Sequence, residues 1–149
     1  IPTFAEAVEL CKDELIGAYI EIKDDAAIHS VIETLREQRV TGHSIVGSFR
    51  PDWLMAVKAE YPRIATSVMF NAPDLDPVLL ARSVQADFVH PCWERLPHPS
   101  ALLTPDWVAR VREADLGIIC WHEERPEQIA ALRRAGVDGI CSDAPELLT

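Results

Sequence analysis

The chain has 149 residues, 48% of them hydrophobic, which is enough for a sizeable core and predicts a single domain. Its net charge of −10 argues against a nucleic acid or another polyanion as the main partner, because phosphate backbones are bound by clustered Lys and Arg. No apolar run approaches the roughly 20 residues of a bilayer-spanning helix, so we expect a soluble chain without a membrane span.

The four cysteines form no Cys-x-x-Cys pair; they are Cys11, Cys92, Cys120 and Cys141. Two of them fall in predicted strands, where a free, buried thiol is the usual state. Spacing alone leaves disulfides open. We expect reduced thiols and, with them, a cytoplasmic location.

Helical and strand patterns alternate along the chain. A helix is predicted at residues 3–15, where the first residues have capping-box spacing and Gly17 ends the helix. A strand at 18–23 follows, and Asp25 caps the next helix, whose apolar residues recur at helical spacing. His29 falls off that apolar stripe, which predicts a solvated surface histidine.

The alternation continues to the end of the sequence. Further strands are predicted at 44–49, 64–70, 87–90, 117–121 and 137–141. Five helices begin with a proline near the first turn, where the missing N–H is tolerated: Pro51, Pro77, Pro105, Pro126 and Pro145. This order predicts a parallel sheet with crossover helices. No glycine-rich phosphate-binding turn follows any strand, which disfavours the nucleotide-binding open sheets.

The first strand carries an acid and a base on one face. Because side chains alternate along a strand, Glu21 and Lys23 share a face with Tyr19, and the apolar residues between them point the other way. In a (β/α)₈ TIM barrel the outer face packs on helices and polar groups converge at the carboxyl ends of the strands. The pattern therefore predicts such a barrel with a site near Glu21. A same-face ion pair within the strand is the alternative interpretation.

At this point the chain resembles the glycerophosphodiester phosphodiesterases, TIM barrels of the phospholipase C-like phosphodiesterase group. The resemblance covers essentially the whole chain and rests on the order and spacing of short stretches. These are Ile1-Pro-Thr-Phe-Ala-Glu-Ala-Val8, Ile20-Glu-Ile-Lys23, Ser48-Phe49, Trp121, and Gly136-Val-Asp-Gly-Ile140 followed by Ser142-Asp143 and Pro145.

The resemblance implies roles for three residues, Glu21, Lys23 and Trp121. Glu21 matches a ligand to a divalent cation, Ca²⁺ or Mg²⁺, for which a carboxylate is the expected hard ligand. Lys23 matches a residue that contacts the substrate phosphate or orders the acidic cluster. Trp121 matches a residue of the substrate pocket, to which we also assign Phe49 and His90. The cation and the lysine would neutralise charge on a pentavalent phosphorus transition state.

The family's two catalytic histidines and its first acidic ligands belong to motifs that this sequence lacks. His-Arg-Gly and Glu-Asn-Thr occur nowhere, and all five histidines lie downstream of Glu21. A complete barrel runs to about 250 residues, whereas this chain has six βα units and begins on a helix. We therefore expect residues 1–149 to be the C-terminal part of a barrel. Two strands and the catalytic histidine pair would lie upstream of Ile1, and the fragment alone would be inactive.

Two other departures bear on substrate preference. His122-Glu123-Glu124 replaces the family's Thr-Val-Asn after Trp121, and His90 stands where the family often has Asn. A zinc site built from His90, Cys92, His98 and His122 fits no trusted spacing. The loop 91–103 is predicted to be a wall of the binding site or a proline-stiffened surface loop.

The implied activity is metal-dependent hydrolysis of a glycerophosphodiester to glycerol 3-phosphate and an alcohol. The alternative is a non-catalytic module, a degenerate or truncated barrel used for binding or assembly. Six strands with two open edges predict pairing with another copy or with a separate N-terminal piece. A third hypothesis, another phosphate-binding TIM barrel, rests on the stretch Gly136–Gly139 near the last strand.

Overall fold

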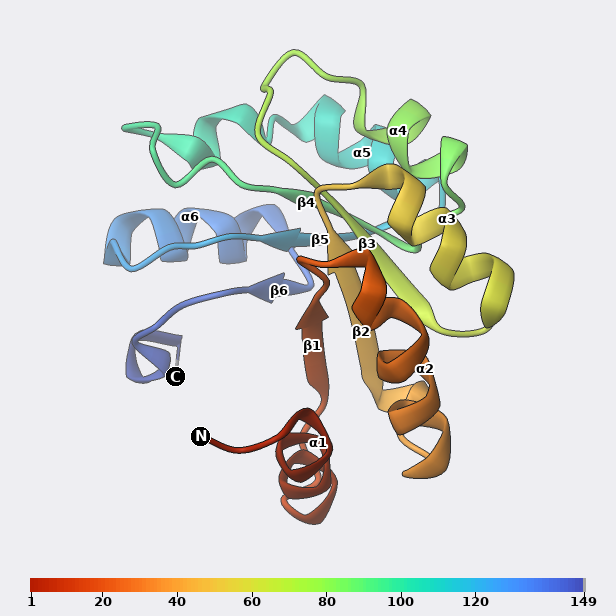
Figure 1. The fold of residues 1–149 in the computed structure, drawn as a ribbon. Helices are drawn as coiled ribbons and strands as arrows, with labels where there is room; N and C mark the ends of the chain where they lie inside the picture. Colours follow the sequence, from red (N-terminus) through yellow and green to blue (C-terminus); the bar gives the residue numbers. More distant parts are fainter. Residues whose placement is uncertain (149) are drawn as a thin grey trace.

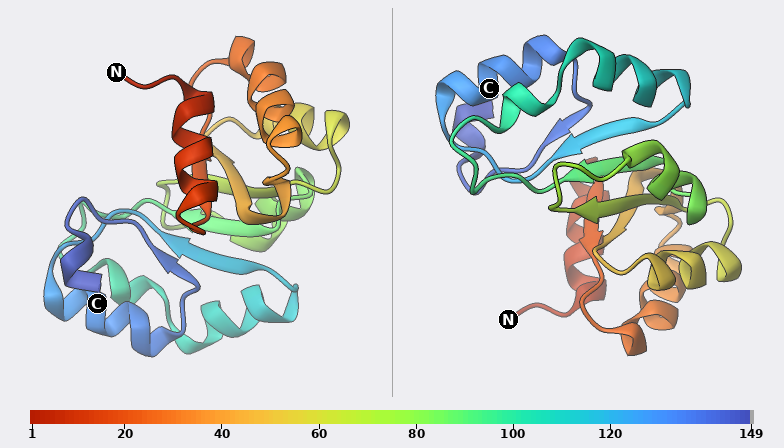
Figure 2. Two further views of the ribbon diagram at one scale, coloured as in Figure 1. Left: turned by 90° about the horizontal axis from the view of Figure 1, so that it is seen from below. Right: turned by 90° about the horizontal axis from the view of Figure 1, so that it is seen from above.

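The computed structural model describes residues 1–148 and shows a curled, six-stranded parallel sheet with helices along its outer face (Figures 1 and 2). The strands are β1 (Ala18–Glu21), β2 (Ser44–Ser48), β3 (Ala65–Phe70), β4 (Phe88–Pro91), β5 (Gly117–Cys120) and β6 (Gly139–Ile140). They pair in chain order, so β1 and β6 form the two edges. The result is a half-barrel, which confirms the predicted fold class.

Helices connect the strands as expected for βα units. They are α1 (Phe4–Asp13), α2 (Ile28–Glu37), α3 (Pro51–Glu60), α4 (Pro77–Ser83), α5 (Pro105–Glu113) and α6 (Pro126–Ala135). The first of them lies at the amino end of β1, as Figure 1 shows. Short 3₁₀ turns complete the path at Asp25–Ala27, Thr41–His43, Pro99–Leu102 and Pro145–Leu148.

Two apolar clusters hold the helices to the sheet. One lies under α1–α3 and includes Ile32, Leu35, Val46 and Val57, and the other lies under α4–α6 and includes Val68, Val89, Val111 and Ile118. All eight side chains are fully buried. Burial of one such aliphatic side chain stabilises the fold by about 1.5–3 kcal/mol. The inward residues predicted from periodicity therefore form the core.

The first helix ends earlier than predicted. It stops at Asp13, and the left-handed residue that terminates it is Leu15, with a φ of 57°, rather than Gly17. The N–H of Ile16 donates to the carbonyl of Cys11 at 2.9 Å, which closes the last turn. This hydrogen bond requires the left-handed residue at position 15.

The cap of the second helical segment also differs from the prediction. Asp24, not Asp25, accepts the capping hydrogen bond, which the N–H of Ala26 donates at 3.0 Å. Asp24 has extended backbone angles, so its carboxylate reaches over the turn that Asp25 itself begins. That 3₁₀ turn then leads into α2.

Other local predictions are confirmed. Thr3 and Glu6 form the capping box, all five helix-opening prolines begin helical turns, and Gly136 ends α6 with a φ of 76°. All four cysteines are free. Among residues 1–148, no helix has the length and apolar character that crossing a bilayer requires.

Two aspartates at the amino ends of the strands have a structural role. Asp138 accepts hydrogen bonds from the N–H of Ile118 at 2.6 Å and from Arg112 at 2.7 Å. Asp87 does the same with the N–H of Thr66 and with Lys58, both at 2.7 Å. These contacts tie neighbouring strands to the helices that precede them.

The stretch Gly136–Gly139 leads into β6, which begins at Gly139, and does not follow that strand. Its Asp138 is engaged by Arg112 at the amino end of the sheet. Phosphate sites of TIM barrels are built from loops that follow the strands, at the opposite end. The phosphate-binding hypothesis based on this stretch is therefore wrong.

Candidate functional site at the carboxyl ends of the strands

The acid and base of the first strand lie at its carboxyl end. Nζ of Lys23 is 3.2 Å from Oε2 of Glu21, so the ion pair of the alternative interpretation is present. However, the Lys23 side chain is 73% exposed and that of Glu21 is 24% exposed. Burial therefore does not force the two charges together, and the Glu21 carboxylate keeps oxygen atoms available for another ligand.

The ends of β1 and β2 are hydrogen-bonded to each other. The N–H of Ile22 donates to the carbonyl of Gly47 at 2.9 Å, and Oγ of Ser48 donates to the carbonyl of Ile22 at 3.1 Å. Phe49 follows directly and has an exposed aromatic ring. Glu21, Lys23 and Phe49 thus stand on adjacent strand ends.

Inside the curled sheet, Tyr19 of β1 meets His90 of β4. The tyrosine oxygen lies 2.6 Å from Nδ1 of the imidazole. Burial raises the pKa of Tyr19, so the hydroxyl keeps its proton, and burial lowers the pKa of His90 to about 4, so the ring is neutral. The contact therefore joins a protonated hydroxyl to a neutral imidazole. His90 is only 1% exposed, and its assignment to the substrate pocket stays a prediction.

An open cleft of about 330 Å³ lies between the segments that follow β2, β4 and β5. Two of its walls are the rings of Phe49 and Trp121, whose centroids are 6.4 Å apart at an interplanar angle of 61°. The remaining lining residues are Asn71, Cys92, Trp93, Glu94, Arg95 and Leu96. The structure thus brings together two residues assigned to the substrate pocket. The loop after β4 lines this cleft, and its role as a wall of the binding site stays a prediction.

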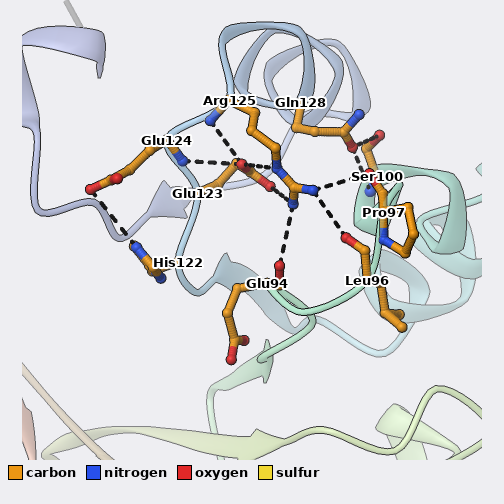
Figure 3. A network of polar contacts seen from close by, with 9 residues as sticks. All are labelled: Glu94, Leu96, Pro97, Ser100, His122, Glu123, Glu124, Arg125 and Gln128. Atoms are coloured by element: carbon orange, nitrogen blue, oxygen red, sulfur yellow. Dashed lines mark hydrogen bonds and ion pairs between the residues drawn. The ribbon is translucent and has the colours of Figure 1, made fainter.

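An acid–base pair after β5 is the most densely bonded polar group at this end (Figure 3). Arg125 donates two hydrogen bonds to the Glu123 carboxylate, from Nε to Oε1 at 2.7 Å and from Nη2 to Oε2 at 2.6 Å. Oε1 also accepts the backbone N–H groups of Glu124 and Arg125 at 3.0 and 2.9 Å. Burial opposes the charge on Glu123, but these contacts with Arg125 hold its pKa below the ordinary value.

The same guanidinium fastens the loop that walls the cleft. Nη1 of Arg125 donates to the carbonyls of Leu96 and Pro97, both at 3.0 Å. Oγ of Ser100 adds a bond to Gln128 of α6 at 2.7 Å. Sequence reasoning treated Glu123 only as a departure from the family and missed Arg125. The spacing Glu-x-Arg immediately before Pro126 was the sequence signal that could have indicated this ion pair.

His122 and Glu124 flank the buried Glu123 and approach Asp143, which follows β6. The possible ligand atoms of these three residues all lie within 4.8 Å of one another. Within residues 1–148 this is the only group of His, Cys, Asp and Glu side chains close enough to hold a metal ion. Of the residues considered for a zinc site, only His122 belongs to it.

Comparison with known proteins identifies the family of the chain. Residues 1–147 match the glycerophosphoryl diester phosphodiesterase family. The chain belongs to this family. A glycerophosphodiester phosphodiesterase of Caldanaerobacter subterraneus subsp. tengcongensis is 26% identical over 153 residues, which cover 99% of this chain and 60% of the relative. The chain therefore spans 60% of the length of this curated family member.

Solved structures of the family share the fold. A phosphodiesterase of Oleispira antarctica, in complex with the product sn-glycerol-3-phosphate, superposes with a TM-score of 0.79 at 20% identity and covers 98% of this chain and 59% of its own. A glycerophosphodiester phosphodiesterase of Agrobacterium tumefaciens gives a TM-score of 0.77 at 19% identity, with 99% and 60% covered. The predicted family and the TIM-barrel fold are confirmed.

The family is generally dependent on a divalent metal ion, and the described residues offer carboxylate and imidazole ligands for one. Glu21 fits a hard cation as one ligand, because within residues 1–148 no backbone N–H donates to its carboxylate and its side chain is partly open to solvent. Ca²⁺ takes about 6–8 oxygen ligands and Mg²⁺ keeps several waters. Glu21 would therefore share the cation with water, substrate oxygens and other carboxylates.

Proposed function

We propose that this chain supplies the metal-ligand and substrate-binding part of a glycerophosphodiester phosphodiesterase. The enzyme would hydrolyse a glycerophosphodiester to glycerol 3-phosphate and an alcohol. The observation that carries the proposal is the family match over residues 1–147 combined with Glu21 and Lys23 at a strand end next to Phe49. The product bound to the Oleispira antarctica relative is of the same chemical class.

Each residue of this site has a proposed role. Glu21 holds Ca²⁺ or Mg²⁺, which when bound withdraws charge from the phosphate. Lys23, mostly in solvent, is free to turn its ammonium group to a phosphate oxygen. Phe49 and Trp121 form the apolar walls against which the glycerol or alcohol group packs. His90, which is hydrogen-bonded to Tyr19 inside the curled sheet, is the fifth residue assigned to this pocket.

The general acid and base come, in this proposal, from a segment outside residues 1–149. His90 is neutral, buried and bonded to Tyr19, and His122 lies beside Glu124. Neither of these two contacts Glu21. Two further strands before β1 would pair with the open edges of the sheet and close the barrel, and these strands would carry the catalytic histidines.

The decisive measurement is release of glycerol 3-phosphate from a set of glycerophosphodiesters with Mg²⁺ or Ca²⁺. Purified residues 1–149 should show no turnover, whereas a protein extended upstream of Ile1 to include the first two strands should be active. Glu21→Gln in the extended protein should lower turnover at least a hundredfold, and Glu37→Gln on α2 should not. Metal-dependent turnover by residues 1–149 alone would overturn the assignment and direct attention to His90 and His122.

A non-catalytic binding or assembly module is the second candidate. The two open sheet edges favour it, because unpaired edges recruit partners. In either case we expect residues 1–149 to pair with another copy or with a separate N-terminal piece. Sedimentation that shows a stable monomer would count against this pairing. The upstream coding sequence separates the two functions, since His-Arg-Gly and Glu-Asn-Thr there mean an enzyme. The cytoplasmic location stays a prediction.

A further inference from the structure

The structure assigns a second cation site to His122, Glu124 and Asp143. We propose that these residues bind a divalent transition-metal ion of the zinc class, with an imidazole and two carboxylates as ligands. The three come from the loops that follow β5 and β6, and they include neither Glu21 nor Lys23. A hard cation at Glu21 would leave this site free.

The two loops that carry the ligands are fixed to each other. The N–H of Glu123 donates to the carbonyl of Cys141 at 3.0 Å, directly between the two ligand-bearing segments. The Glu123 carboxylate turns inward to Arg125 and also accepts the N–H of Glu124 at 3.0 Å. Figure 3 shows His122 and Glu124 turned to the other side of the chain, toward each other. The backbone therefore holds the side chains of His122 and Glu124 on the same side of the chain, opposite to Glu123.

The ligand atoms are free of strong competing bonds. Nε2 of His122 is 3.8 Å from Oε1 of Glu124, which is too long for a hydrogen bond. Asp143 makes no hydrogen bond or ion pair with the other described residues (1–148). The His122 and Glu124 side chains are 33% and 44% exposed, so they can rotate to contract the group from its present 4.8 Å span. An ion with ligand distances of about 2.0–2.2 Å requires such a contraction.

The donor set selects the class of metal. Ca²⁺ and Mg²⁺ take oxygen ligands, whereas an imidazole nitrogen favours Zn²⁺, Ni²⁺, Co²⁺ or Cu²⁺. Three protein ligands on a tetrahedral ion leave the fourth position open, as in zinc sites that bind water or another small ligand. Two carboxylates and one neutral imidazole balance the double positive charge. His122 is half-buried and the two carboxylates are exposed, which predicts weaker binding than at a buried structural zinc site.

The chain contains a matched control of the same composition. His29 also contacts two carboxylates, Glu60 at 2.7 Å and Glu33 at 3.8 Å. These lie against opposite ring nitrogens, Nδ1 and Nε2, so they cannot converge on one ion. Surface histidine with two acidic neighbours is therefore present twice, but only the His122 group has the geometry of a ligand set.

The test uses residues 1–149 with the metal alone, in chelator-treated buffer at neutral pH containing Mg²⁺ to fill any hard-cation site. Calorimetric titration with Zn²⁺ and absorption with Co²⁺ should give one equivalent bound. His122→Gln and Asp143→Asn should each weaken binding at least tenfold, and His29→Gln should leave it unchanged. Circular dichroism confirms that the variants are folded.

Three outcomes would overturn the proposal. They are the absence of stoichiometric binding, an equal effect of His122→Gln and His29→Gln, and a thiolate-to-cobalt charge-transfer band showing that a cysteine is the ligand instead. Glu21→Gln serves as a further control and should not alter Zn²⁺ binding. The outcome is therefore independent of the phosphodiesterase assignment, which is tested by turnover and by Glu21.

Discussion

The carboxyl ends of β1 and β5 each carry an acid and a base two residues apart, and the two pairs are used in opposite ways. Glu21 and Lys23 form a single 3.2 Å contact near solvent. Glu123 and Arg125 form a two-pronged contact at 2.6 and 2.7 Å around a nearly buried carboxylate. One pair keeps ligand capacity for another group, and the other uses it to hold loops together.

The difference follows from the chemistry of the two bases. Arginine presents a planar fork of donors, so Arg125 contacts Glu123 and two loop carbonyls at once. Lysine is a compact point charge on a flexible stem, which suits transient contact with a phosphate. The same Glu-x-base spacing therefore gives an open corner at β1 (Glu21 and Lys23), where we propose cation and phosphate binding, and a structural clamp at β5 (Glu123 and Arg125).

The largest effect on the free energy of unfolding should come from removing Glu123, the acid of the clamp. Glu123→Ala leaves the Arg125 fork and two backbone N–H groups without their acceptor, which should destabilise the fold by about 3 kcal/mol. Urea unfolding measures the loss. Asp52→Asn is the control, because Asp52 and Arg50 form a similar two-pronged pair that is exposed to solvent. Equal changes in both variants would contradict the structural role of Glu123.

Stability should also depend on pH through His90, which is hydrogen-bonded to Tyr19 of β1. Burial lowers the pKa of His90 from 6.5 to about 4, so between these values the unfolded chain binds a proton that the folded chain does not. Stability should therefore be full above the unfolded pKa and fall by about 2 kcal/mol between about pH 7 and about pH 5. His90→Gln should remove this slope in urea titrations. The exposed control His98→Gln should retain it.

A conservative replacement of Arg125, the base of the clamp, should have a smaller effect on the free energy of unfolding. Arg125→Lys keeps the charge but loses the fork that bonds Glu123, Leu96 and Pro97 together, at a cost of about 1–2 kcal/mol. Hydrogen exchange should increase in the loop 94–103. Arg95→Lys, in the same loop but 94% exposed, should change neither quantity. An unchanged loop in Arg125→Lys would mean that the guanidinium geometry is not needed.

The smallest effect on stability is expected at the β1 corner itself. Glu21→Gln removes one ion pair whose lysine is mostly in solvent, and it should change the unfolding free energy by less than about 0.5 kcal/mol. It should nevertheless reduce Mg²⁺-dependent binding of glycerol 3-phosphate, measured by calorimetry against Glu37→Gln. Strong destabilisation without loss of binding would reverse the comparison and make Glu21 the structural residue.

Local sequence patterns determined most of the secondary structure. Helix-opening prolines, the Thr3–Glu6 capping box and apolar periodicity depend on neighbours in sequence, so they were readable directly. The two errors, at Gly17 and Asp25, concern which of several adjacent residues completes a turn. Backbone hydrogen bonds decide this over a range of a few residues, and the composition of the segment leaves the choice open.

By itself the sequence determined the order of βα units, the core stripes, the family and the face on which Glu21 and Lys23 lie. Only the tertiary structure decided which charged residues are engaged. It joined Glu123 and Arg125 to a loop some 30 positions earlier, roughly the length of one βα unit, and it brought Asp143 to His122. Such contacts depend on the distances between side chains at neighbouring strand ends. The order of residues along the sequence does not contain those distances.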